Sequence, residues 1–119
     1  MISKYAPDAS VFMASTGEVY GESLRDGPAT EATAPRPTSV YAVSKLASEL
    51  VMRATLPPQA KLIIARPANH TGSGQAEDFV VASFARQVAD AELGLGPNAI
   101  MTGSLAPERD FLHVEDVID

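Results

Sequence analysis

The fold class is decided by residues 10–17, which read Ser10-Val11-Phe12-Met13-Ala14-Ser15-Thr16-Gly17. The first five form a short apolar run without polar alternation, which is typical of a strand buried on both faces of a parallel sheet. Small hydroxyl residues and a glycine follow directly, as expected for a tight turn after a strand. Sites in open parallel sheets lie at such strand ends. The stretch therefore predicts an α/β protein with a site just after residue 14.

A helix is predicted over residues 41–55, and Thr38 or Ser39 can cap it. Tyr41 and Lys45 are four residues apart, so they lie one above the other on one face of this helix. A fixed ammonium beside a phenol favours the phenolate, which suits a proton donor. The same spacing also occurs on ordinary solvated helices. The predicted apolar face, with this pair at its edge, consists of Val43, Leu46, Ala47, Leu50, Val51 and Ala54.

The other segments repeat the order strand, loop, helix, which argues for a parallel sheet. The predicted elements are a helical turn within residues 1–9, a surface loop over 22–37, a strand at 61–65, a loop at 66–75, strands at 99–103 and 109–114, and a further helix beginning near residue 119. Asp78 is predicted to cap one more helix. Its apolar positions at helical spacing are Phe79, Val80, Phe84, Val88 and Ala91, and Phe79, Val80, Val81 and Phe84 are expected to pack on the sheet.

Composition restricts the classes of function. Hydrophobic residues make up 45% of the 119 residues and charged residues 20%, as in a folded globular protein. The net charge is -6 and no basic run occurs, which argues against binding to nucleic acid. There is no cysteine, so no thiolate metal site or disulfide framework is expected. No apolar run is long enough to predict a membrane span, and we expect a cytoplasmic protein.

Four motifs together resemble the extended short-chain dehydrogenase/reductase family, in its sugar-nucleotide epimerase/dehydratase branch. In chain order they are Ser15-Thr16 with Val19-Tyr20-Gly21, Tyr41-x-x-x-Lys45, Arg66-Pro67-x-Asn69, and Arg109-Asp110-Phe111-x-His113-Val114-x-Asp116. The resemblance covers essentially the whole chain and implies a partial Rossmann-like, doubly wound parallel sheet. Within the branch, residues 66–87 look most like enzymes that reduce the 4-keto group of GDP-4-dehydro-6-deoxy-D-mannose. GDP-mannose 4,6-dehydratases are the nearest alternative.

The resemblance implies a catalytic set of Thr16, Tyr41 and Lys45. Tyr41 would exchange a proton with the sugar 4-oxygen, while Lys45 would bind the nicotinamide ribose and stabilise the phenolate. Thr16 would hydrogen-bond the same sugar oxygen, although a hydroxyl that merely caps a turn is the alternative. The residues implied to contact the cofactor, NAD or NADP, are Ser15, Tyr41, Lys45, Arg66 and Pro67.

The resemblance also implies a set of substrate contacts: Glu18, Asn69, Val80 and Arg109. Arg109 would bind the diphosphate through its forked guanidinium, or else form an ordinary ion pair with a neighbouring acid. In dehydratase relatives a glutamate at the position of Glu18 acts as a base, usually beside an aspartate or a serine. Here that neighbour is Gly17, which favours a reductase. No metal is expected, because His70 has no partner at ligand spacing.

The glycine-rich dinucleotide fingerprint of the family is not found in this sequence. We therefore expect the chain to be the central and C-terminal part of an NAD(P)-binding domain with the start of a substrate-binding lobe. The full-length parent is expected to be a homodimeric enzyme that acts on a nucleotide sugar, and the 119 residues alone are expected to be inactive. A non-catalytic module that binds a nucleotide sugar or a protein is the alternative from another class. The choice between NAD and NADP stays open.

Overall fold

The computed structural model describes residues 2–119. The chain folds as two compact units, one ending at Ala68 and the other comprising Asn69–Asp119. The elements of the first unit are α1 (Ile2–Tyr5), β1 (Ser10–Ala14), the 3₁₀ turns η1 (Gly17–Val19) and η2 (Glu22–Asp26), α2 (Val40–Thr55) and β2 (Lys61–Ala65). The strands at residues 10–14 and 61–65 are thus confirmed with their predicted bounds.

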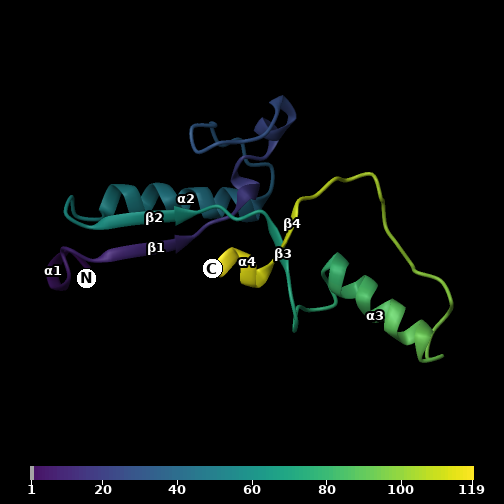
Figure 1. Cartoon of the computed structure of the whole chain (residues 1–119). Coiled ribbons are helices and arrows are strands. Elements are labelled where there is room, and N and C mark those ends of the chain that lie inside the picture. The colour runs from purple at the N-terminus through teal and green to yellow at the C-terminus, as the bar shows by residue number, and fades with distance from the viewer. Residues whose placement is uncertain (1) are drawn as a thin grey trace. The chain divides into compact units, whose positions relative to one another are not determined.

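The first unit is built on a parallel pair of strands joined through a helix. β1 and β2 pair in register from Ser10 with Lys61 to Ala14 with Ala65, and α2 runs alongside them (Figure 1). Because successive side chains of a strand point to opposite faces, Phe12 and its partner Ile63 share one face. Both are more than half exposed, whereas Met13, on the other face, is buried. The carboxyl ends of both strands meet at one edge, where the loop after β1 begins.

The predicted apolar face of α2 was wrong. Val43, Leu50 and Val51 are all more than half exposed, and the fully buried positions are Ala42 and Glu49. The cap was predicted correctly, since the Ser39 hydroxyl accepts a hydrogen bond from the Ala42 N–H at 3.0 Å. The side of α2 that meets the strand ends carries polar contacts, which hydrophobicity does not predict. Lys45 and Glu49 form hydrogen bonds with residues at the end of β1.

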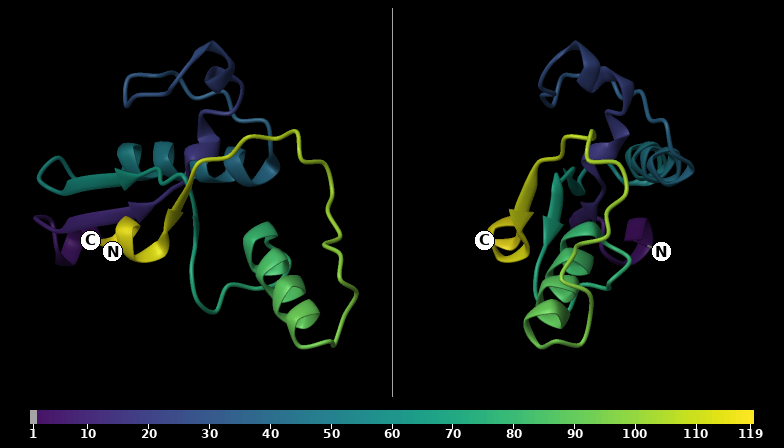
Figure 2. Two further views of the ribbon diagram at one scale, coloured as in Figure 1. Left: turned by 45° about the vertical axis from the view of Figure 1, so that its right-hand side comes forward. Right: turned by 90° about the vertical axis from the view of Figure 1, so that its right-hand side faces the viewer.

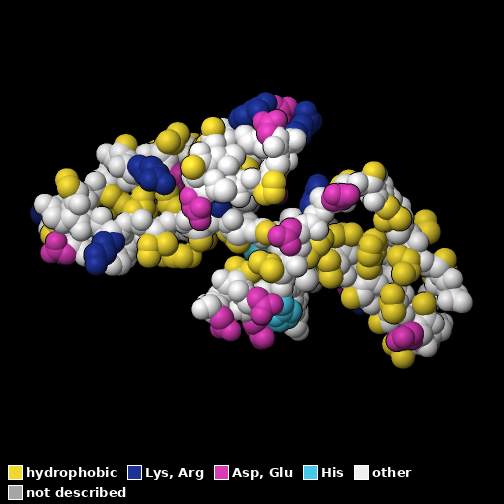
Figure 3. Space-filling model, turned by 45° about the horizontal axis from the view of Figure 1, so that its top comes forward, with side chains coloured by type: hydrophobic (Ala, Val, Ile, Leu, Met, Phe, Trp, Pro, Cys, Tyr) yellow, Lys and Arg dark blue, Asp and Glu magenta, His cyan; other side chains and the backbone are white. Residues whose placement is uncertain are grey.

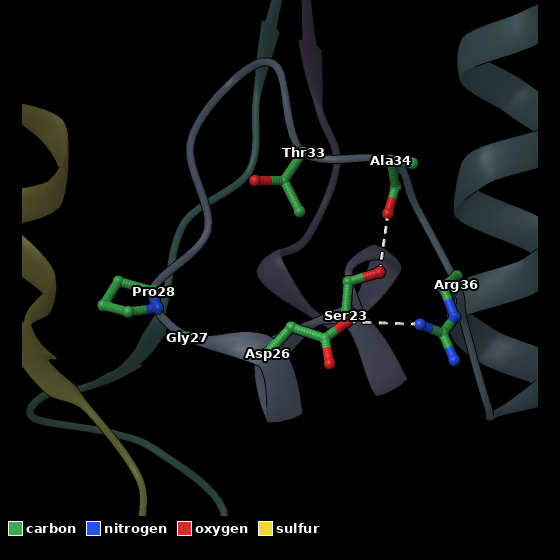
Figure 4. Close-up of a pocket in the computed structure, with 7 residues that line it drawn as sticks. All are labelled: Ser23, Asp26, Gly27, Pro28, Thr33, Ala34 and Arg36. Atoms are coloured by element: carbon green, nitrogen blue, oxygen red, sulfur yellow. Dashed lines mark hydrogen bonds and ion pairs between the residues drawn. The ribbon is translucent and has the colours of Figure 1, made fainter.

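The loop over residues 22–37 is tied into a ring (Figure 4). The Ser23 hydroxyl donates to the Ala34 carbonyl at 2.7 Å, and Arg36 forms ion pairs with Glu22 and Asp26 at 3.2 and 3.4 Å. The ring closes where the Glu22 N–H donates to the Arg36 carbonyl at 3.0 Å. Pro28 and Thr33 also line the hollow inside it. The segment is therefore an ordered surface loop with one 3₁₀ turn.

The second unit contains β3 (Asn69–Thr71), α3 (Val80–Glu92), β4 (Phe111–His113) and α4 (Val114–Ile118). β3 and β4 form a second parallel pair, with His70 opposite Leu112 (Figure 2). The prediction of an unbroken loop over 66–75 was therefore wrong, and the strand predicted at 109–114 is confined to three residues. The next helix begins at Val114, earlier than predicted.

Two further predictions in this unit were wrong. Asp78 does not cap α3, because the helix begins one residue later, with Phe79 at the capping position and no side-chain cap. Residues 99–103 form no strand. The Gln87 side chain takes both main-chain groups of Met101, accepting from its N–H at 2.6 Å and donating to its carbonyl at 3.2 Å. A side-chain amide of α3 thus replaces the neighbouring strand that an apolar run of this kind would otherwise pair with.

Large apolar side chains are exposed in both units, and hydrophobic side chains are spread over the visible face in Figure 3. Phe79 and Val80 are 57% and 48% exposed, so the expectation that these two pack on a sheet was wrong, whereas Val81 and Phe84 are partly buried. Phe79 is at the capping position of the helix and Val80 is its first residue. Among the residues described, no helix has both the length and the apolar character needed to cross a bilayer.

Gly21 generates a prediction about the ring. Its φ of 48° with ψ of -118° suits only glycine, and an added Cβ would collide with the Arg36 carbonyl oxygen. We expect Gly21→Ala to lower the free energy of unfolding by about 1–3 kcal/mol, the cost of such a backbone conformation. Urea unfolding of the purified protein measures this. The matched control is Gly103→Ala, where an added Cβ meets nothing within 4 Å. Equal stability of the two variants would contradict the prediction.

Candidate active site at the carboxyl ends of β1 and β2

The turn after β1 places two hydroxyl groups at the strand end. Ser15 is buried, and its N–H continues the ladder by donating to the Ala65 carbonyl at 2.8 Å. Thr16 caps η1, because its Oγ1 accepts a hydrogen bond from the Glu18 N–H at 3.2 Å. Since Oγ1 serves as an acceptor in this bond, its own hydrogen is still able to donate to a ligand. Thr16 is therefore both a capping residue and a candidate donor.

Tyr41 and Lys45 lie on the first two turns of α2. The Lys45 Nζ is 5.7 Å from the centre of the Tyr41 ring, so the predicted approach of cation and phenol is confirmed. The same ammonium donates to the Ala14 carbonyl, the last residue of β1, at 3.0 Å. Tyr41 is 52% exposed, so a ligand can reach its ring from solvent. The pair is thus fixed to the strand end immediately before Ser15 and Thr16.

Glu18 is exposed and contacts the beginning of α2. Its Oε2 accepts a hydrogen bond from the Ser39 hydroxyl at 3.3 Å, and Ser39 is the residue that caps this helix. A carboxylate at a helix N-terminus is also stabilised by the helix dipole. The neighbouring Gly17 has little space for a side chain, because a Cβ would lie 3.0 Å from the Pro67 carbonyl oxygen. That oxygen accepts the Gly17 N–H at 2.9 Å, so the two strand-end loops touch through main chain.

Arg66 joins the end of β2 to the middle of α2. Its Nε and Nη2 donate to the two carboxylate oxygens of Glu49 at 3.0 and 2.5 Å, a forked geometry. The Ser15 hydroxyl also donates to Glu49. On its other side the Arg66 guanidinium lies 4.9 Å from the centre of the Tyr20 ring, a cation–π distance. Arg66, the first residue of the loop predicted after this strand, is thus also the cationic half of an ion pair.

The charge states of this pair reinforce each other. The hydrogen bond from Arg66 is the largest effect on Glu49 and holds the pKa of its carboxyl below the ordinary value, against the opposing effect of burial. The Ser15 hydroxyl acts in the same direction. In turn, the hydrogen bond to Glu49 raises the pKa of Arg66. Both groups therefore remain charged at neutral pH, even though Glu49 is only 1% exposed.

Three predicted contact residues belong to the second unit. Asn69 begins β3 and is exposed, and Val80 is the first residue of α3. Arg109 is exposed, and its Nη1 donates to the carbonyl of Glu108 at 2.8 Å. Their roles toward a substrate stay predictions. The hollow of Figure 4 contains none of the predicted site residues.

Glu49 was not singled out from the sequence. Four residues after Lys45, it suggests an exposed i,i+4 ion pair, which is an ordinary surface feature. Instead Lys45 donates to a main-chain carbonyl and Glu49 pairs with Arg66. Two features of the sequence could have indicated its role. Glu49 lies on the same helix face as Ala42 and Lys45, and Arg66, a possible partner, directly follows a predicted strand.

Comparison with known proteins supports the reading of the motifs. A reductase of Pseudomonas aeruginosa, GDP-6-deoxy-D-mannose reductase, is 42% identical over 106 residues, which is 87% of this chain and 35% of the relative. Among solved structures, RMD from Pseudomonas aeruginosa complexed with NADPH superimposes with a TM-score of 0.84 at 39% identity, over 93% of this chain and 38% of that one. The structure of dTDP-glucose 4,6-dehydratase from Bacillus anthracis in complex with NAD superimposes with a TM-score of 0.74 at 29% identity. The match covers 98% of this chain and 36% of that one.

These relatives establish the fold as a Rossmann-like α/β fold of the short-chain dehydrogenase/reductase type. The chain spans little more than a third of the length of each of them. A sequence model of one family, described as GDP-mannose 4,6 dehydratase, matches residues 1–119. The chain therefore belongs to the GDP-mannose 4,6 dehydratase family of sugar-nucleotide enzymes.

Proposed function

We propose that this chain is the central and C-terminal part of an NAD(P)-binding Rossmann domain, with the start of a substrate-binding lobe. The full-length protein reduces the 4-keto group of GDP-4-dehydro-6-deoxy-D-mannose. The observation that carries the proposal is the placement of Lys45 between the Tyr41 ring and the end of β1, directly before Ser15 and Thr16. A relative that is 42% identical is a GDP-6-deoxy-D-mannose reductase, which supports this substrate class.

The residues of the first unit fit the chemistry of a carbonyl reduction. A nicotinamide cofactor, when bound, supplies the hydride that adds to C4 of the sugar. Tyr41 then donates its phenolic proton to the 4-oxygen, so that the carbonyl becomes a secondary alcohol, and Lys45 stabilises the phenolate that remains. Thr16 holds the 4-oxygen beside Tyr41 through its hydroxyl hydrogen.

The donor set also fits a dinucleotide cofactor. The Lys45 ammonium has three hydrogens, and the Ala14 carbonyl accepts one of them, so the others can reach the hydroxyls of a ribose. Ser15 and the loop at Arg66 and Pro67 complete the cofactor side. Related structures hold NADPH in one case and NAD in another, and we propose one of these two for this protein. Glu18, Asn69, Val80 and Arg109 are proposed to contact the nucleotide sugar.

We further propose a cytoplasmic homodimer that binds neither nucleic acid nor membrane. The net charge of -6 supports the proposal that the protein does not bind nucleic acid, because phosphate backbones are bound through clustered lysine and arginine. The absence of cysteine from the sequence is compatible with a reducing compartment.

A GDP-mannose 4,6-dehydratase is the second candidate, because the matching family is described by that activity and Glu18 stands where such an enzyme needs a base. Two observations favour the reductase. Glu18 is engaged by the hydroxyl that caps α2, and Gly17 leaves no room for a second acidic side chain without a shift of main chain. A non-catalytic binding module is the candidate of another class.

Replacing the proton donor tests the proposed reaction. In the full-length protein, we expect Tyr41→Phe to lower kcat for reduction of GDP-4-dehydro-6-deoxy-D-mannose by about 10²–10⁴-fold, the usual contribution of a general acid. Oxidation of NADPH and NADH, followed by absorbance, measures the rate with each cofactor. Tyr5→Phe is the matched control, because Tyr5 is 72% exposed and outside the site. An unchanged rate in Tyr41→Phe would contradict its role as proton donor, whereas absence of turnover by the unmodified protein would favour the non-catalytic binding module.

Glu18 separates the two enzyme candidates. We expect Glu18→Gln to keep reductase kcat within about threefold, because the amide oxygen still accepts the Ser39 hydroxyl and the reduction needs no second base. The unmodified protein should not convert GDP-mannose into its 4-keto product. Chromatography of the nucleotide sugars measures both activities. Conversion of GDP-mannose that falls by about 10² or more in Glu18→Gln would identify a dehydratase instead.

A further inference from the structure

Glu49 is a charged side chain in a place that water does not reach. It is 1% exposed and is the largest fully buried side chain among the residues described. A buried carboxylate is costly unless partners satisfy it, and replacement of a buried ion pair by apolar residues is often neutral for stability. Stability alone therefore gives a weak reason for a charge here. A second reason lies in what the carboxylate holds.

The carboxylate joins three segments of the first unit. It accepts two hydrogen bonds from Arg66, at the end of β2, and one from Ser15, at the end of β1. Glu49 itself is eight residues after Tyr41 on the face of α2 that also carries Lys45. The residue next to Ser15 is Thr16. Each segment that contributes to the proposed chemistry of this unit is therefore bonded to one side chain.

Side chains on two successive turns of α2 form hydrogen bonds with two successive residues at the end of β1. Lys45 donates to the Ala14 carbonyl at 3.0 Å, and Glu49 accepts from the hydroxyl of Ser15. Two contacts one helical turn apart fix both the rotation of a helix about its axis and its position along that axis. A helix held in this way keeps Tyr41 in a constant position relative to Thr16.

Arg66 is itself restrained from the other side. Its guanidinium faces the Tyr20 ring at 4.9 Å, and Tyr20 follows η1 directly. A forked guanidinium between a ring and a carboxylate has little freedom to turn, so the direction of both bonds to Glu49 is constrained. The residues described contain no unpartnered buried polar side-chain atom, which is the condition for a buried network to rigidify a site.

We propose that Glu49 is a positioning residue, which acts through Ser15, Arg66 and the rotation of α2 to set the placement of Tyr41 relative to Thr16. This inference rests on the proposed reduction of a sugar 4-ketone. Misplacement of a reacting group by about 1 Å can cost about 10²-fold in rate. The effect should therefore appear in kcat, while the affinity for cofactor should change little.

The test uses the full-length protein and the variant Glu49→Gln, which keeps the shape of the side chain and removes its charge. We expect kcat to fall by about 10–100-fold and KM for the nicotinamide cofactor to stay within about threefold, a margin that corresponds to less than 1 kcal/mol. Asp90→Asn is the matched control, because Asp90 pairs with Arg86 in a partly exposed i,i+4 pair of the same chemistry. Its kcat should equal that of the unmodified protein. An unchanged kcat in Glu49→Gln would overturn the proposal.

A double variant, Glu49→Met with Arg66→Met, separates positioning from stability, because apolar residues of similar length can fill the same space. We expect a thermal unfolding midpoint close to that of the unmodified protein, with kcat still reduced at least tenfold. Recovery of the full kcat would mean that the pair only stabilises the fold, and would overturn the proposal. A rise in cofactor KM with kcat unchanged would mean that the pair acts only on cofactor binding and not on the placement of Tyr41, and would also overturn it.

A crystal structure of Glu49→Gln gives a readout that is independent of the substrate. We expect the Tyr41 ring to be displaced relative to the Thr16 hydroxyl, because only the bond from Lys45 to the Ala14 carbonyl then holds α2 against β1. An unchanged placement of Tyr41 relative to Thr16 would overturn the positioning role. Absence of turnover by the unmodified protein would instead overturn the proposed reaction, and the crystal structures would still decide the role of Glu49.

Discussion

The ion pair between Glu49 and Arg66 is the constraint on which the first unit depends. Removing one member of a buried pair leaves the other charge without compensation, at a cost of about 3–5 kcal/mol. The fold therefore has to place the middle of α2, which carries Glu49, against the end of β2, which carries Arg66. Ser15 must lie at the same point, because its hydroxyl also donates to Glu49. Parallel pairing of β1 with β2 delivers both strand ends to one edge, and the ion pair then fixes the helix above that edge.

This constraint also explains which side of α2 faces the strands. Apolar side chains normally determine the buried face of a helix, and here Val43, Leu50 and Val51 would be the natural choice. The structure instead buries Ala42 and Glu49. A small residue, Ala42, allows close approach of the helix, and the Glu49 carboxylate about two turns further on is matched to two donor residues, Arg66 and Ser15. Within this unit, directional polar contacts hold the side of α2 that meets the strand ends.

The sequence predicted those parts of the fold that depend on local pattern. Ser10–Ala14 and Lys61–Ala65 are apolar runs bounded by turn residues, so both strands were found with their bounds, and Ser39 was one of the two caps predicted for the helix. The failures depend on distant partners. The segment 99–103 is apolar enough for a strand, but its main chain is taken by the Gln87 amide, which no local pattern shows. Likewise, β3 exists because residues 111–113 pair with it.

The same distinction applies to the candidate site. The roles proposed for the site residues come from the resemblance of the motifs. The proximity of Tyr41 and Lys45 could be predicted because helical spacing alone brings them together, and the strand end located Ser15 and Thr16. Glu49 could not, because its role requires knowledge that α2 crosses the ends of both strands. The motifs name residues that are proposed to meet substrate and cofactor, whereas the residues that hold them are recognisable only once the chain is folded.

The charge on Glu49 also has a consequence for pH. Since its partners depress its pKa in the folded state, the carboxylate contributes stability above its ordinary pKa near 4.5, and this contribution is lost as the pH falls through the folded value. Arg66, with a raised pKa, keeps its charge throughout this range. Near neutral pH, the pair therefore supplies fixed geometry and does not titrate. An apolar pair would fill the same volume without directing the Ser15 hydroxyl, and this is why a charged group at this position favours a role in positioning over a role in packing alone.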